Sequence, residues 1–84
     1  MTQAGNRERL LRFLDTIRIP ASSLADIQDT DDLVQVGLID SLAILEIVAF
    51  LEGEFGINFA KTGLDPGLLS SVASILDLVE RPPR

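Results

Sequence analysis

The chain has 84 residues, of which 46% are hydrophobic and 24% charged, a composition typical of one compact domain rather than of a disordered segment. Thirteen Asp and Glu against seven Lys and Arg give a net charge of -6, which argues against a nucleic-acid partner because phosphate binding needs cationic side chains. The chain contains no Cys or His, so disulfides, zinc sites of the usual ligand types, thiol nucleophiles and the commonest general base are excluded.

The apolar content is not arranged as a membrane or export signal. The longest apolar run, 42–51, is interrupted by Glu46, and no charged segment followed by an apolar segment opens the chain. We therefore expect a soluble, cytoplasmic monomer that does not insert into a membrane.

The first half of the chain predicts one helix and one long loop. Asn6 is a suitable N-cap for an amphipathic helix over 7–18, and Pro20 ends it. The stretch 19–40 is predicted to be a loop held to the core at intervals by single apolar residues. Apolar residues with helical spacing in the first helix are Leu10, Leu11, Phe13, Leu14 and Ile17, and those in the loop are Leu24, Ile27, Leu33 and Val36.

The second half predicts three further helices. Good helix formers fill the central helix over 41–55, which Gly56 ends. Asp65 caps a short third helix over 66–69, and Ser70 caps a last helix over 71–80 that Pro82 and Pro83 end. With no alternating strand pattern, the sequence predicts a single all-α domain, 1–84: a four-helix bundle of three main helices and a short one.

Ser41 is the serine placed directly at the start of the central helix. A helix start exposes unpaired N–H groups and the positive end of the helix dipole, which favours a phosphate on a side chain there. For an isolated Asp-Ser pair, ordinary capping is the better explanation by far. The dipeptide alone is therefore poor evidence for a modified serine.

The longer run GLIDSLAILEIVAFLEGEFGI, from Gly37 to Ile57, resembles the phosphopantetheine attachment region of acyl and peptidyl carrier proteins. In that family an aspartate, the modified serine and a leucine precede a helix with a glutamate five residues after the serine and an acidic run ending in Phe-Gly. The matching residues are Asp40, Ser41, Leu42, Glu46 and 52–56. The predicted helices agree along nearly the whole chain, so the resemblance implies an acyl-carrier-protein-like fold.

The resemblance implies that a phosphopantetheinyl transferase uses coenzyme A and magnesium to attach 4'-phosphopantetheine to Ser41. The domain then carries acyl or aminoacyl thioesters between a ligase or acyltransferase and downstream biosynthetic enzymes, and it is no enzyme itself. The absence of Cys and His agrees with this role, because the thiol and the base must then come from other molecules. Asp40 either caps the helix or contributes to the transferase's metal site. The chain itself is expected to hold no metal.

The family's partner surface lies along the central helix, and the resemblance transfers it to one helix side. Three- and four-residue spacings place these positions together, although Leu42 and Leu45 fit the core equally well. Gly53 departs from the family, which often has an acid there. The transferred positions are Asp40, Leu42, Leu45, Glu46, Ala49 and Glu52.

Gly37 stands four residues before Ser41, a spacing that looks more like stand-alone carriers of amino acids, such as D-alanine carriers, and of natural-product pathways. Two alternatives from other classes remain. The first is an acidic helical protein-interaction module in which Ser41 is only a cap, and the second is a hydrolase with Ser41 as nucleophile, disfavoured because no His is present.

Overall fold

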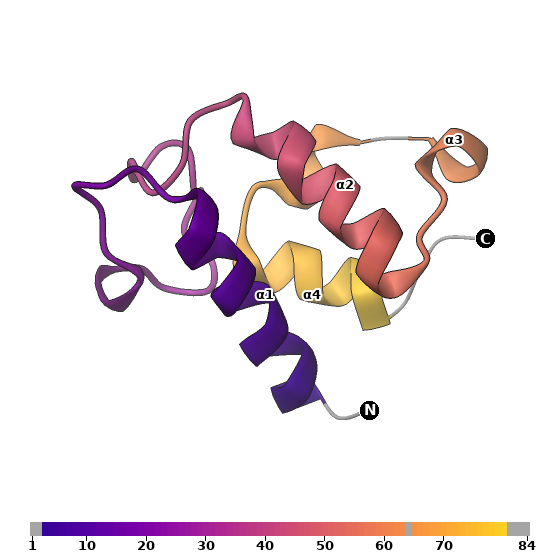
Figure 1. Cartoon of the computed structure of the whole chain (residues 1–84), viewed down its shortest axis with the longest axis horizontal. Coiled ribbons are helices and arrows are strands. Elements are labelled where there is room, and N and C mark those ends of the chain that lie inside the picture. The colour runs from indigo at the N-terminus through magenta and orange to yellow at the C-terminus, as the bar shows by residue number, and fades with distance from the viewer. Residues whose placement is uncertain (1–2, 64, 81–84) are drawn as a thin grey trace.

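The computed structural model describes residues 3–63 and 65–80, and its regular elements there are all helical (Figure 1). In chain order the elements are α1 (Gln3–Ile17), η1 (Leu24–Asp26), α2 (Ala43–Phe55), α3 (Phe59–Thr62), η2 (Pro66–Leu69) and α4 (Val72–Glu80). The η elements are single 3₁₀ turns. The all-α prediction is therefore confirmed for the described residues.

The three long helices enclose one core. α1 packs against α4 and α2, and η2 contacts both α2 and α4 (Figure 1). Within the described residues, no helix is both long and apolar enough to cross a membrane. The buried hydrophobic residues come from the helices and from the loops between them: Leu10, Leu14, Leu33, Leu38, Ile39, Ala43, Ile47, Leu51, Ile57, Phe59, Leu69, Val72, Ile75, Leu76 and Leu78.

The first helix begins earlier than the sequence analysis expected. α1 starts at Gln3, so Asn6 lies inside the helix with 8% of its surface exposed, and its prediction as the N-cap is wrong. The helix continues upstream of Asn6 through Gln3 and Ala4, which are good helix formers, despite the intervening Gly5, which is a poor one. It ends at Ile17, before Pro20, as the proline predicts.

The long loop is anchored to the core, but not at every predicted position. Leu33 is fully buried, whereas Val36 is 48% exposed, so the prediction of Val36 as an anchor is wrong. Gly37 follows with a φ of 80°, a left-handed conformation that turns the chain. After this turn the chain buries Leu38 and Ile39 instead.

Backbone hydrogen bonds also tie the loop to distant segments. The N–H of Ile19 donates to the carbonyl of Leu38 over 2.7 Å, closing the loop on itself. The N–H of Leu33 donates to the carbonyl of Ser70 over 2.8 Å. A loop of about twenty residues is uncommon in so small a domain, and these bonds give this one a defined shape.

The segment after α2 contains an element that the sequence analysis did not predict. α2 ends at Gly56, which has a φ of 68°, as expected. The one-turn helix α3 then follows, because the side chain of Asn58 accepts a hydrogen bond from the N–H of Lys61 over 3.1 Å. Asn58 was the available signal, since asparagine is a favoured N-cap.

The last two elements are capped nearly as predicted. Asp65 accepts a hydrogen bond from the N–H of Gly67 at the start of η2, which occupies the expected positions as a 3₁₀ turn. For α4 the cap is Ser71 and not Ser70. The hydroxyl of Ser71 accepts from the N–H of Ser74, and the hydroxyl of Ser74 accepts from the N–H of Ser71, a reciprocal arrangement that Ser70 lies one residue too early to make. The predicted stop at 82–83 lies outside the described residues.

Candidate functional site

A tight turn over residues 40–42 opens the central helix. α2 itself begins at Ala43, two residues later than expected. The N–H of Ala43 lies 3.0 Å from a carboxylate oxygen of Asp40 and 3.1 Å from its carbonyl oxygen. The Asp40 side chain therefore caps the turn that leads into α2, a contact close to the capping role that was one of the two left open for it.

Ser41 occupies the middle of this turn. Its side chain is exposed, and its hydroxyl has no hydrogen-bond partner among the described residues, while its carbonyl accepts from the N–H of Ile44 over 3.4 Å. The N–H groups of Ser41 and Leu42 likewise have no acceptor in the described part of the chain. The hydroxyl is thus accessible at the positive end of the helix dipole.

The outer face of α2 carries the side chains that the resemblance assigned to partners. Leu42 and Leu45 are 73% and 65% exposed, so they do not belong to the core. Two of the inward residues, Ile47 and Leu51, are fully buried. The structure thus separates two sides of one helix. We call the exposed set the outer face; it consists of Asp40, Ser41, Leu42, Leu45, Glu46, Ala49 and Glu52.

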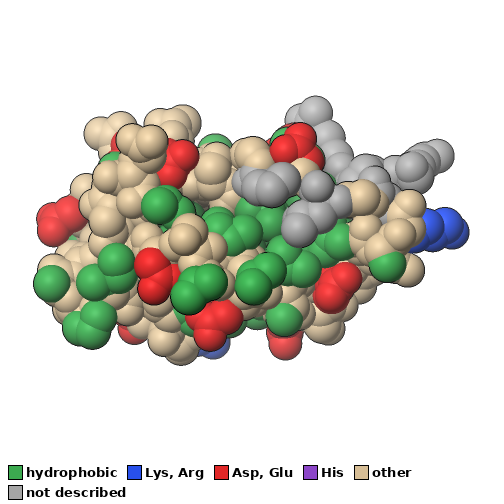
Figure 2. All heavy atoms as spheres, turned by 90° about the horizontal axis from the view of Figure 1, so that it is seen from above, with side chains coloured by type: hydrophobic (Ala, Val, Ile, Leu, Met, Phe, Trp, Pro, Cys, Tyr) green, Lys and Arg blue, Asp and Glu red, His purple; other side chains and the backbone are tan. Residues whose placement is uncertain are grey.

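Acidic and hydrophobic side chains are mixed on this side of the molecule. Figure 2 shows the view from above, in which red and green side chains alternate and blue ones appear only at the margin. Asp40, Glu46 and Glu52 form no ion pair with any described residue. A surface of this kind suits a partner that is both basic and apolar.

Two arginines of α1 form ion pairs with other acids instead. Arg7 pairs with Asp29 of the loop over 2.6 Å, and Arg9 pairs with Glu54 of α2, also over 2.6 Å. The hydrogen bond from Arg7 is the main cause that lowers the pKa of Asp29 below its ordinary value. Two acids of the middle segment are therefore paired within the chain, and those of the outer face are not.

Aromatic contacts hold α2 against α1 on the side away from the outer face. The rings of Phe13 and Phe50 stack with centroids 4.1 Å apart, and the guanidinium of Arg9 lies 4.6 Å from the ring centre of Phe55. Phe50 is partly buried in this contact. These contacts hold α2 against α1 and leave the outer face exposed.

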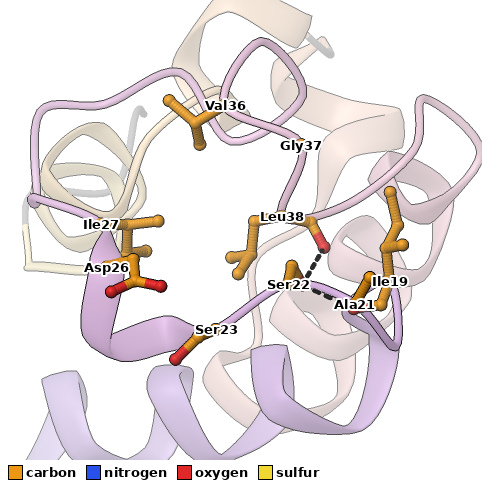
Figure 3. Close-up of a pocket in the computed structure, with 9 residues that line it drawn as sticks. All are labelled: Ile19, Ala21, Ser22, Ser23, Asp26, Ile27, Val36, Gly37 and Leu38. Carbon is orange, nitrogen blue, oxygen red and sulfur yellow. Dashed lines mark hydrogen bonds between the residues drawn. The ribbon is translucent and has the colours of Figure 1, made fainter.

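One concave feature gave no signal in the sequence. The long loop encloses a cavity of about 300 Å³ beside residues 36–38 (Figure 3). Its walls come from positions far apart along the loop, and only the closure of the loop brings them together. Within the described residues, no group of acidic side chains is arranged to hold a metal ion.

Comparison with known proteins identified no relative of this chain. No family model, curated protein or solved structure matches the chain.

Proposed function

We propose that the chain is a carrier protein whose Ser41 hydroxyl receives 4'-phosphopantetheine and then presents acyl or aminoacyl thioesters to biosynthetic enzymes. One observation carries this proposal. An accessible serine lies in the turn that opens α2, next to a helix side of exposed leucines and unpaired carboxylates. The motif from Gly37 to Ile57, which resembles carrier proteins, adds to it.

The residues around Ser41 fit a phosphodiester. The side chain is exposed, so an attached group meets no steric barrier from the described residues. The two N–H groups without acceptors, on Ser41 and Leu42, lie at the helix end where a negative charge is favoured. The nearby carboxylate of Asp40 is held by the N–H of Ala43, and this bond offsets part of its repulsion toward a phosphate.

The attachment step requires activation from outside the chain. The Ser41 oxygen forms a bond to the phosphorus that bears the pantetheine, the bond from this phosphorus to the nucleotide half of coenzyme A breaks, and the hydroxyl proton leaves. The chain has no His, and the Ser41 hydroxyl makes no hydrogen bond to a described carboxylate. A separate transferase, with its magnesium ion, supplies the base and the metal in this proposal.

The outer face gives the proposed partners a common docking surface. Exposed leucines supply apolar contact, and unpaired acids speed association with basic enzymes. Such contacts suit brief encounters with a transferase, an acyl or aminoacyl ligase and later enzymes of one pathway. We propose that the carrier acts in the cytoplasm, where coenzyme A is available, and that it acts as a monomer.

The decisive experiment is intact mass spectrometry after incubation with coenzyme A, magnesium and a broad-specificity phosphopantetheinyl transferase. We expect the wild-type chain to gain the mass of one phosphopantetheine group and Ser41→Ala to gain nothing. Ser23→Ala, a change at another exposed serine, should still be modified. A folded wild-type chain that stays unmodified would contradict the carrier function.

The exposed leucines also favour a second candidate, an acidic interaction module without a prosthetic group. This module would bind its partner equally well with alanine at position 41. Loss of partner binding in Ser41→Ala, together with the mass gain of the wild-type chain, excludes this second candidate.

A further inference from the structure

The cavity in the long loop is bounded by two stretches of that loop, just after α1 and just before the turn at Ser41. In Figure 3 Leu38 points across the opening toward Ile27, and Val36 lies above them. Leu38 is 1% exposed, so its side chain belongs to the core beneath the cavity, whereas Val36 lies at the exposed rim. The nine lining residues are Ile19, Ala21, Ser22, Ser23, Asp26, Ile27, Val36, Gly37 and Leu38.

Hydrogen bonds hold this cavity open in a defined shape. The hydroxyl of Ser22 lies 2.6 Å from the carbonyl oxygen of Ile19 and 3.2 Å from that of Leu38, so it joins the two walls (Figure 3). The guanidinium of Arg18 donates to the carbonyl of Ser22 over 2.7 Å from outside the cavity. A preformed cavity costs less to occupy than one that must be ordered by its ligand.

The accessible lining combines the apolar side chains of Ile27 and Val36 with one charge. Asp26 lies beside Ile27 at the edge of the opening, and its carboxylate has no hydrogen-bond or ion-pair partner among the described residues. The lining contains no Lys or Arg. A small ligand with a cationic group and a short apolar part therefore complements this cavity.

The cavity lies within reach of a group attached to Ser41. Leu38 is three residues before Ser41, and three residues of chain span at most about 11 Å. A phosphopantetheine arm has as many chain atoms as four or five residues, so its extended reach is about 15 Å by the same geometry. The arm is therefore long enough to span the distance from Ser41 to residue 38 of the lining.

We infer that this loop cavity receives the cargo end of the arm and that the cargo is a small aminoacyl group, with its ammonium against Asp26 and its side chain beside Ile27 and Val36. The inference rests on the proposed carrier function. It goes beyond that function by assigning the cargo a chemical class and a binding site formed by the loop rather than by the helices.

The test compares two loaded forms of the protein that differ in one charged group. The transferase would load Ser41 with the arm from alanyl-coenzyme A or from propionyl-coenzyme A, whose acyl group has the same carbon skeleton without the ammonium. Mass spectrometry confirms each loading. Amide chemical shifts are then compared with those of the unacylated, phosphopantetheine-bearing protein, and we expect the alanyl form alone to shift the amides of Asp26, Ile27 and Gly37.

Two variants test the role of the charge. Asp26→Asn should abolish the shifts specific to the alanyl form, and Glu8→Gln, which changes an exposed acid on α1, should leave them intact. Loaded protein without loop shifts would overturn the cavity while leaving the carrier function standing, and equal shifts with propionyl would overturn the aminoacyl class. Failure of loading at Ser41 would contradict both proposals. The comparison of the two loaded forms uses the wild-type chain, so it does not depend on the folding of a variant.

Discussion

Two glycines near the end of α2 have opposite structural roles. Gly53 lies inside the helix, and a Cβ built there would meet no atom within 4 Å. Gly56 is the C-cap, with a φ of 68°, and its N–H donates to the carbonyl of Leu51. Glycine is thus required at position 56 and only weakens the helix at position 53.

We therefore expect Gly53→Ala to raise the free energy of unfolding by about 0.5–1 kcal/mol, because alanine loses less backbone entropy in a helix. Gly56→Ala should lower it by about 1 kcal/mol, because a Cβ is disfavoured in the left-handed conformation. Urea denaturation measures both changes as shifts of the midpoint at constant slope. Shifts of the same sign for the two variants would contradict this assignment.

At the scale of elements, Asp29 joins the loop to two helices. Its carboxylate accepts two hydrogen bonds from Arg7 of α1, over 2.6 and 3.2 Å, and its carbonyl accepts from the N–H of Ala73 in α4 over 2.8 Å. Asp29 thereby places the middle of the loop against the helical frame. Both side chains of the ion pair are nearly half exposed, so we expect the pair to contribute only modestly to stability.

The pH dependence of this contribution follows from the lowered pKa of Asp29, whose main cause is the hydrogen bond from Arg7. A pKa that is lower in the folded state adds stability above the ordinary value of 3.8 and loses it as pH falls through the folded value. We expect Asp29→Asn to lower the urea midpoint by a constant amount from about pH 7 to pH 5, and this difference to shrink below 3.8.

Glu8→Gln is the control for this prediction, since Glu8 is an exposed acid of α1 that makes no ion pair with a described residue. Its midpoint should follow that of the wild-type chain at every pH. An Asp29→Asn difference that grows on acidification would show that the ion pair is not the source of the stability.

Local chemistry explains which elements the sequence predicts well. Gly56 and Asp65 were correctly identified because a helix end needs a left-handed residue and a 3₁₀ start needs an acceptor, both short-range requirements. Val36 was misassigned because its burial depends on the turn at Gly37, and the loop cavity was missed because it forms only when Leu38 returns to Ile19. Long-range closure leaves no periodic pattern in a sequence.

The candidate site shows the same difference between local signals, which the sequence carries, and long-range packing, which it does not. The spacing of Leu42 and Leu45 placed them on one helix side, but spacing alone did not decide between core and surface. The full burial of Ile47 and Leu51 settles that choice, because it leaves Leu42 and Leu45 on the exposed side of α2. The position of Ser41 followed from the motif, whereas its two-residue separation from α2 depends on the cap that Asp40 makes.

At the scale of the whole molecule, the net charge of -6 is unevenly distributed. Arg7 and Arg9 neutralise Asp29 and Glu54 within the chain, which leaves other acids without an ion pair among the described residues. The outer face keeps three acids without ion pairs in the described residues, next to the serine proposed for modification. Acids without ion pairs beside Ser41 favour the approach of a basic enzyme to this side of the proposed carrier.

This distribution predicts how loading responds to charge and salt. We expect the double variant Glu46→Gln, Glu52→Gln to lower kcat/KM for modification by the transferase by roughly tenfold at low ionic strength, because steering acts on association. The kcat should change little, since Ser41 and Asp40 are untouched. Raising the salt concentration should bring the wild-type rate down toward that of the variant.

The matched control removes the same two charges from other elements, with Glu8→Gln on α1 and Glu80→Gln at the end of α4, both at exposed positions. Its net charge equals that of the outer-face variant, so the two proteins differ only in where the charge is lost. We expect this control to retain nearly the wild-type kcat/KM and salt dependence. Equal losses in the two double variants would show that total charge, and not the outer face of α2, governs the encounter.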